Sequence, residues 1–245
     1  FVGGSWDLAG ITTQINANAV LGILQAIQNY SPSTRFYQAS TSELFGNSSN
    51  KQDEETPFAP ESPYAAAKLY AYWTTKIFRK SHGIHASNGI LFNHESPIRG
   101  PQFVTRKITD SIAKIQLGML DTLQLGNVNA KRDWGYAKDY VEGMHLMLQV
   151  DKPDTYVLAT NRTESVRDFV NLTCKAADMT ISWIGRGEKE YAIDTKTGKK
   201  LVVINPSFYR PAEVDLLIGN PQKAHDLLGW SPKTNLETLC SMMYE

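Results

Sequence analysis

The chain has 245 residues, and its 25 Lys and Arg residues balance its 25 Asp and Glu residues. The hydrophobic fraction of 42% is ordinary for a globular protein, and this length suits one large domain or a domain with a smaller lobe. The neutral charge argues against a general nucleic-acid binder, and no apolar run approaches the roughly 18 to 20 residues of a membrane span. No secretory signal is visible, so we expect no membrane and no nucleic-acid partner.

Helices and strands alternate over the first 180 residues. A helix over 12–30 is predicted by apolar residues at helical spacing and ends before Pro32. A short aromatic-rich run predicts a buried strand at 34–41, and a long helix follows at 64–82 with Gly83 as its C-cap. The same patterns predict strands at 85–92, 123–127 and 155–160, and helices at 105–117, 136–148 and from the N-cap Ser165. Such alternation indicates βα units and therefore an α/β fold with a mainly parallel sheet.

The pattern changes after about residue 183. Residues 183–204 predict two strands around a turn, and the basic cluster Lys196–Lys200 is typical of a solvated hairpin turn. Short helices are predicted at 221–229 and 235–243. Cys174 and Cys240 lack a CxxC spacing, so we expect no metal site. They are typical of small apolar residues of helices in a reducing cytoplasm.

Polar residues follow three of the predicted strands, as STSE, NHESPIRG and GN. Open α/β sheets bind ligands at the carboxyl ends of their strands, so these segments are candidates for one site. The sequence contains neither a GxGxxG motif nor a Walker loop, which normally opens the first βα unit of a phosphate-binding fold. If this fold binds a dinucleotide, that unit lies upstream of Phe1.

Tyr64 and Lys68 lie four residues apart and therefore on one face of the predicted helix. An ammonium near a phenol favours the phenolate and lowers its pKa, which makes Tyr-x-x-x-Lys a sensible base for a hydroxyl proton. Tyr72 and Lys76 repeat the spacing, but eight residues rotate them by roughly 80°. Tyr64 opens the helix near the strand ends, whereas Tyr72 lies mid-helix and is expected to pack in the interior.

Thr41, Ser42 and Glu43 end a buried strand and begin a loop. A hydroxyl at such an end can hydrogen-bond a substrate oxygen, and the adjacent carboxylate can transfer a proton. The alternative is that these residues only start the loop or cap a short helix. Their combination with Tyr64 and Lys68 on the next element favours a catalytic role.

Motifs in order along nearly the whole chain resemble those of the GDP-mannose 4,6-dehydratases, a family of extended short-chain dehydrogenases/reductases. They are FYQASTSELFG, SPYAAAKLYAYW, GILFNHESPIRG, FVTRKIT, LGNVNAKRDWGYAKDYVEGM, FYRPAEVDLLIGNP and KAHDLLGW, whereas about 183–203 matches least. The resemblance implies the C-terminal part of a Rossmann-like NADP-binding domain over 1–100. It also implies a smaller mixed α/β lobe for the sugar nucleotide, mainly over 101–245, with some elements returning to the Rossmann sheet.

The resemblance implies a lyase of nucleotide-sugar metabolism that uses NADP and leads towards GDP-fucose. Tyr64 would be the base for the mannosyl C4 hydroxyl, with Lys68 lowering its pKa and holding the nicotinamide ribose. Thr41 would hydrogen-bond the C4 oxygen, and Glu43 would take the C5 proton and protonate the leaving C6 hydroxide. Related epimerases and reductases generally lack the carboxylate at the Glu43 position, so Glu43 argues for dehydration.

The resemblance also assigns binding roles. His94 and Arg99 would contact the cofactor, although a histidine at such a position is often satisfied by backbone alone. GDP-mannose would be bound by residues that suit a diphosphate and a ribose, namely Asn93, Lys107, Arg132, Arg210 and Glu213. Taken singly, each basic residue is more typical of surface charge, and Glu213 could instead pair with Arg210.

The helices at 12–30 and 64–82 commonly form a two-fold four-helix interface in this enzyme group, so we predict a homo-oligomer, either a dimer or a tetramer. Tyr70, Tyr72 and Trp73 suit such a surface, but the same stripe can face its own sheet. All five tryptophans are expected to pack inside the domain or the lobe.

The chain begins at Phe1 without Met and lacks the family's glycine-rich loop. We therefore expect a fragment that misses most of the cofactor-binding segment and is inactive alone. Two alternatives stay open: a related nucleotide-sugar epimerase or reductase, and an inactive truncated binding or oligomerisation subunit.

Overall fold

The computed structural model describes residues 2–48, 50–209 and 217–245. Its central sheet is parallel and ordered β1–β2–β7, from Phe36–Thr41, Ala86–Leu91 and Thr155–Leu158. Phe36 pairs with Ala86, and Asn88 pairs with Thr155. All six residues of β2 are buried, as expected for a parallel strand with both faces covered. The predicted α/β class is confirmed.

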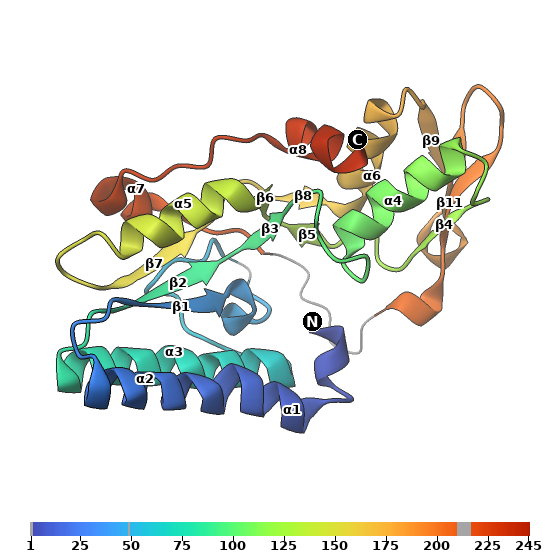
Figure 1. The fold of residues 1–245 in the computed structure, drawn as a ribbon. Coiled ribbons are helices and arrows are strands. Elements are labelled where there is room, and N and C mark those ends of the chain that lie inside the picture. The colour runs from blue at the N-terminus through green and yellow to red at the C-terminus, as the bar shows by residue number, and fades with distance from the viewer. Residues whose placement is uncertain (1, 49, 210–216) are drawn as a thin grey trace.

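Helices cover both faces of this sheet (Figure 1). One layer holds α1 (Ala9–Thr13), α2 (Ala19–Tyr30) and α3 (Pro63–His82), and the other holds α5 (Ala137–Met147) and α7 (Gln222–Leu228). Val20, Leu24 and Ile27 are the buried residues of α2, and their spacing of three and four places them on one face. Gly83 ends α3 with a left-handed φ of 65°, which confirms it as the C-cap.

The first helix differs from its prediction in two ways. It begins at Ala9 rather than at residue 12, and α1 and α2 are joined through one π-helical segment, η2 (Gln14–Asn18). A pattern of 3.6 residues per turn does not reveal such a segment, because a π turn shifts the apolar stripe without ending it.

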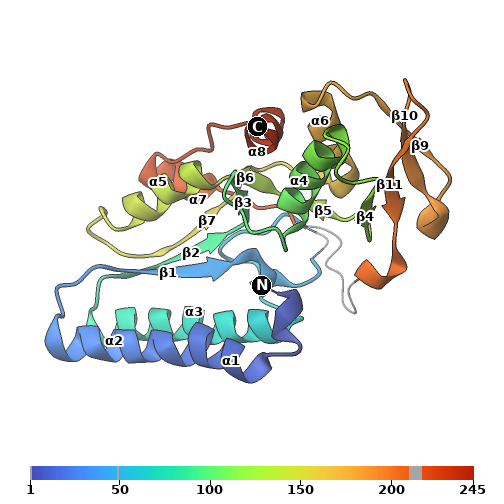
Figure 2. The ribbon, with the colours of Figure 1, turned by 45° about the vertical axis from the view of Figure 1, so that its right-hand side comes forward.

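The smaller lobe stands beside the carboxyl ends of the central strands (Figure 2). Its sheet has the order β4–β11–β10–β9, formed by Leu123–Leu125, Lys200–Ile204, Tyr191–Asp194 and Ile181–Ile184. Three helices complete the lobe, α4 (Val104–Gln116), α6 (Val166–Ala176) and α8 (Leu236–Tyr244). Their core buries Ile108, Ile112, Phe169 and both cysteines, which are free thiols as the sequence predicted.

The prediction for residues 183–204 was incomplete. β10 and β11 form the expected hairpin around an exposed basic turn, but β9 adds a third strand that starts at Ile181. A short 3-10 helix, η4 (Gly187–Lys189), separates β9 from β10. β9 has only four residues and alternates half-buried with exposed positions, so its pairing with β10 rather than its own pattern defines it.

Two pairs of very short strands join the sheet to the lobe. β3 (Asn93–Glu95) pairs in parallel with β6 (Trp134–Tyr136), and β5 (Lys131–Arg132) pairs with β8 (Glu164–Ser165). The sequence missed all four of these strands, whereas the three-residue β4 lies inside the strand predicted at 123–127. Ser165 then caps α6 through a complete capping box with Asp168, which confirms its predicted role.

The tryptophans do not all pack inside. Trp134 and Trp230 are buried and Trp183 is half-buried, but 48% of Trp6 and 47% of Trp73 is exposed, so the expectation was wrong for these two. Tyr72 is buried against its own sheet as predicted, whereas Tyr70 on the same helix is exposed. Within the described ranges no helix is long and apolar enough to cross a membrane.

Candidate active site

The catalytic candidates Thr41 and Glu43 lie where β1 ends. The chain turns there into a 3-10 helix, η3 (Ser42–Phe45), and the Thr41 hydroxyl accepts a hydrogen bond from the Glu43 backbone N–H at 3.3 Å. Leu44 and Phe45 are buried beneath this turn, so it is anchored in the core of the sheet domain. Thr41 therefore does cap the short helix. This contact holds Glu43 at the carboxyl end of β1 and does not exclude it from chemistry.

Gly46 brings the following loop back over this turn. Its φ is 60°, and the Ala59 N–H donates to the Leu44 carbonyl oxygen at 2.9 Å. A Cβ atom at Gly46 would lie 1.9 Å from the Ala59 carbonyl oxygen, so only glycine fits. The loop then reaches Ser62, whose hydroxyl accepts from the Ala65 N–H at 3.0 Å and starts α3 beside Glu43.

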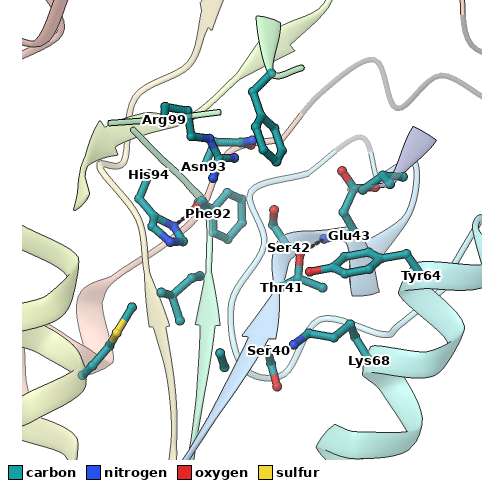
Figure 3. A pocket seen from close by; sticks show the side chains of 15 residues that line it. Ser40, Thr41, Ser42, Glu43, Tyr64, Lys68, Phe92, Asn93, His94 and Arg99 are labelled. Atoms are coloured by element: carbon teal, nitrogen blue, oxygen red, sulfur yellow. Dashed lines mark hydrogen bonds between the residues drawn. The ribbon is translucent and has the colours of Figure 1, made fainter. Parts of the chain in front are cut away.

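Tyr64 and Lys68 point from the first turns of α3 toward Thr41 (Figure 3). Burial raises the pKa of Tyr64, and the charge of Glu43 raises it further. The hydrogen bond with Thr41 and the charge of Arg99 lower it by less. Burial also lowers the pKa of Lys68, whose Nζ atom lies 6.0 Å from the Tyr64 ring centroid. The lowered tyrosine pKa that we expected is wrong for this structure, because burial outweighs the Thr41 hydrogen bond and the charge of Arg99, which both lower the pKa.

His94, Asn93 and Arg99 face this group from β3 and the turn after it (Figure 3). His94 Nδ1 lies 2.8 Å from the Phe92 carbonyl oxygen, and its ring stacks on Tyr140 at 5.0 Å. A carbonyl only accepts, so Nδ1 carries the proton and Nε2 of the neutral ring is an acceptor. Burial lowers the pKa of His94, which favours this neutral form. The backbone hydrogen bond uses only Nδ1, so Nε2 can still accept a hydrogen bond.

Two cavities meet at these residues. The first, of about 290 Å³, is lined by all four catalytic candidates together with Asn93, His94 and Arg99. The second, of about 370 Å³, lies toward the lobe and is lined by Lys107 and Arg132. Glu43, Asn93 and Phe103 line both cavities, so the proton-transfer candidate Glu43 stands where the two spaces join.

The second cavity suits an anionic ligand. Arg132 is buried and donates from Nη1 to the Lys131 carbonyl oxygen at 2.9 Å. Lys107 Nζ lies 3.7 Å from the centroid of the Phe208 ring, and burial lowers its pKa. Phe208 belongs to η5 (Pro206–Phe208), and its carbonyl packs so closely on Gly126 that a Cβ atom there would lie 2.7 Å away.

The structure thus brings together nine of the eleven predicted site residues, whereas Arg210 and Glu213 lie outside the described residues. Sequence reasoning assigned no role to Phe103, Phe208 or Glu95, although all three line the second cavity. All three stand inside motifs that we had singled out, so their position in those motifs was the available signal. In the described part of the chain no three His, Cys, Asp or Glu side chains gather as a metal site would need.

A parallel sheet that carries a Tyr-x-x-x-Lys pair at its carboxyl edge, beside a cavity with basic residues, defines an extended short-chain dehydrogenase/reductase. Solved structures of this class share the fold. RMD from Pseudomonas aeruginosa complexed with NADPH matches with a TM-score of 0.85 and 20% identity, over 100% of this chain and 76% of its own. UDP-glucose 4-epimerase from Thermotoga maritima matches with a TM-score of 0.83 and 20% identity, over 99% and 72%.

The chain belongs to the GDP-mannose 4,6 dehydratase family, whose family model matches residues 1–243. It is 52% identical over 241 residues to the GDP-mannose 4,6-dehydratase of Sinorhizobium fredii, covering 98% of this chain and 67% of the relative. It is 49% identical over 242 residues to the human GDP-mannose 4,6 dehydratase, covering 98% and 65%. The chain therefore spans about two thirds of the length of these relatives.

Proposed function

We propose that the complete protein carrying this chain is an NADP-dependent hydro-lyase that converts GDP-mannose to GDP-4-keto-6-deoxymannose and water. The family supports this substrate. The observation that carries the proposal is the place of Glu43, which lines both cavities beside Thr41 and Tyr64. A carboxylate at that junction can take a proton from the sugar carbon next to the one whose hydroxyl proton Tyr64 removes.

The residues divide the proton transfers among themselves. Tyr64 removes the proton of the C4 hydroxyl, and Thr41 hydrogen-bonds the C4 oxygen as it becomes a ketone. The ketone acidifies the hydrogen on C5, so Glu43 removes that proton and passes it to the hydroxide that leaves C6 as water. One proton must return to C5 to complete the product, which balances the proton removed from the C4 hydroxyl.

The first cavity fits the cofactor at the reacting end. Lys68 and Arg99 supply cations for a polyanionic dinucleotide, and His94 presents an acceptor for an amide N–H group. NADP, when bound, supplies reversible hydride acceptance, from C4 and then back to C6. We propose that residues 1–100 form the C-terminal part of this cofactor-binding domain and that 101–245 mainly form the sugar-nucleotide lobe.

The second cavity holds the sugar nucleotide in this proposal. Lys107 and Arg132 face the diphosphate, and Arg132 is planar and suited to bidentate contacts. Asn93 lies at the junction, and its buried Oδ1 atom has no hydrogen-bond partner in the part of the chain that the structure describes. A sugar hydroxyl would satisfy that acceptor, because buried polar atoms are rarely left unpaired. Arg210 and Glu213 complete the proposed set.

Mass spectrometry of the product tests the function. The complete protein is incubated with GDP-mannose and NADP⁺, and we expect a product that has lost one water without accumulation of NADPH. Net consumption of NADPH would indicate a reductase, and an unchanged mass with altered stereochemistry would indicate an epimerase. Binding of GDP-mannose without any turnover would favour an inactive binding subunit.

Glu43→Gln tests the assignment that separates dehydration from the other chemistries. We expect turnover to fall by about 10²- to 10⁴-fold, while the dissociation constant for GDP-mannose stays within a few-fold. Glu188→Gln makes the same chemical change at an exposed position of the lobe and is the matched control. Turnover that is equal in the two variants would remove Glu43 from the mechanism.

We also propose a homo-oligomer, a dimer or a tetramer, built on the outer face of α1–α3. Exposed apolar side chains follow helical spacing on this helix layer. They are Ile11, Ile15 and Ile23 on the segment from α1 to α2, and Tyr70, Trp73 and Ile77 on α3. We expect Trp73→Glu to shift the mass measured by size-exclusion chromatography toward the monomer, with Tyr30→Glu as the control. A cytoplasmic location is proposed as well, and the two free buried thiols support it.

A further inference from the structure

Glu95 is a buried carboxylate to which the mechanism gives no task. It ends β3, its backbone is paired with Tyr136 of β6, and its side chain is only 2% exposed. Removing a carboxylate from water is costly unless partners compensate for the lost hydration. A buried acid beside the active site therefore requires a reason in the structure around it.

The two side-chain partners of Glu95 line different cavities. Arg99 Nε lies 3.0 Å from Glu95 Oε2, and Arg99 lines the first cavity. The Thr105 hydroxyl donates to the same oxygen at 2.6 Å, and Thr105 lines the second cavity from the first turn of α4. One carboxylate oxygen thus joins the turn after β3 to the helix that carries Lys107.

The surroundings make this connection rigid. Arg99 also lies over the Phe103 ring, with 3.5 Å from its guanidinium carbon to the ring centroid, so it is held from two sides. Thr105 is 1% exposed and cannot turn its hydroxyl to water. The first turn of α4 contains no acidic residue, and its N-cap Phe103 makes no side-chain cap, so Glu95 adds a negative charge beside this positive helix end.

We infer that Glu95 is a positioning residue that orients Arg99 in the first cavity and fixes the first turn of α4, with Lys107, in the second. The inference deepens the proposed function and rests on it for the two ligands, NADP at Arg99 and GDP-mannose at Lys107. Glu95 itself transfers no proton. Its effect is to set the two binding sites in one fixed relation, so that both ligands meet at Glu43.

Three variants separate the two arms of this contact. Glu95→Gln keeps an oxygen that accepts from Thr105 but removes the charge opposite Arg99. Thr105→Val removes the donor at nearly constant shape, and Thr105→Ser restores the hydroxyl. The complete protein is used, and the dissociation constants of NADP⁺ and GDP-mannose are measured by calorimetry together with KM and kcat.

We expect Glu95→Gln to weaken NADP⁺ binding by about 10-fold or more, because the half-buried Arg99 loses the opposite charge that holds it in place. Thr105→Val should raise the dissociation constant and KM for GDP-mannose by about 10-fold with kcat within twofold, while NADP⁺ binding is unchanged. Thr105→Ser should match the wild type within twofold. Wild-type affinity for NADP⁺ in Glu95→Gln, or equal behaviour of the Val and Ser variants, overturns the inference.

Hydrogen exchange over residues 96–110 provides a readout that does not depend on the substrate. Glu95→Gln and Thr105→Val should both exchange faster there than the wild type, and Thr105→Ser should not. If the wild type fails to turn over GDP-mannose, the proposed function fails, but the exchange result still decides the inference. Unchanged exchange in both Glu95→Gln and Thr105→Val overturns it, even if one of the binding effects is seen.

Discussion

Asp133 offers a quantitative test of how the lobe is fixed to the sheet. It lies between Arg132 and Trp134, is fully buried, and accepts three hydrogen bonds. The Thr160 backbone N–H and hydroxyl donate at 2.8 and 2.7 Å, and the Gly219 N–H donates at 3.3 Å. These contacts tie the end of β7 to the segment that carries Arg132. Burial nevertheless raises the pKa of Asp133 from 3.8 to about 6, because it outweighs the hydrogen bonds and the charge of Arg162 that lower it.

A raised carboxyl pKa means that the folded protein holds this proton more tightly than the unfolded chain. The resulting stabilisation is fully present below about 3.8 and is lost as the pH rises through about 6. A shift of this size corresponds to about 3 kcal/mol. In Asp133→Asn this contribution is absent. The difference in free energy of unfolding, wild type minus variant, should therefore fall by about 3 kcal/mol between pH 3 and pH 7.5.

Urea unfolding of the wild type and of Asp133→Asn at a series of pH values measures this difference. We expect it to fall as the pH rises. A difference that stays constant or grows with pH for Asp133→Asn would refute the reasoning. It would mean that the three hydrogen-bond donors outweigh burial and keep Asp133 ionised in the folded protein.

Three further predictions concern the site and the segments that hold it. Gly46→Ala should lower the free energy of unfolding by about 3 kcal/mol or more in a urea titration, because the new Cβ atom would clash with the Ala59 carbonyl oxygen. Gly83→Ala is the control: it has a similar φ but open space around the new Cβ atom, and it should lower the free energy of unfolding by only about 1 kcal/mol. Tyr64→Phe should slow the first hydride transfer, measured by stopped-flow absorbance of NADPH. A base of raised pKa makes kcat/KM rise with pH, and this rise should disappear in the variant. An unchanged pH profile would argue against Tyr64 as the base. Ser165→Ala should cost about 1 kcal/mol by loss of the α6 cap, and a change below a few tenths in thermal unfolding would contradict this.

The elements that the sequence predicted well are those whose signals are local. The helix at α3 is bounded by Ser62 and Pro63 at one end and by Gly83 at the other, and each acts through its own backbone geometry. The strands β1 and β7 were predicted because each is a short run rich in β-branched or aromatic residues between turn signals. The strand β2 has only Ile90 of these types, and it was predicted as the next short run after the Gly83 helix end. The strands β3, β5, β6 and β8 were missed, since each pairs with another strand of only two or three residues, whereas the three-residue β4 pairs with the longer β11 and was predicted.

The candidate site shows the same difference between signals local in the sequence and properties set by tertiary packing. Residue types and spacing, together with the resemblance, picked out Thr41, Glu43, Tyr64 and Lys68, and these residues do line one cavity. The chemistry of their environment was not predictable from spacing. The expected drop in the pKa of Tyr64 is replaced by a rise, because burial depends on every segment that packs around the phenol.

The sequence by itself determined the family, the α/β alternation and the candidate residues, because motif identity and helix caps are properties of neighbouring residues. Only the tertiary structure decided that two cavities join at Glu43, that Trp73 is exposed, and that Glu95 contacts both Arg99 and Thr105. These properties depend on packing between segments far apart in the chain. Burial, electrostatic environment and the meeting of cavities arise from that packing and from no local stretch of sequence.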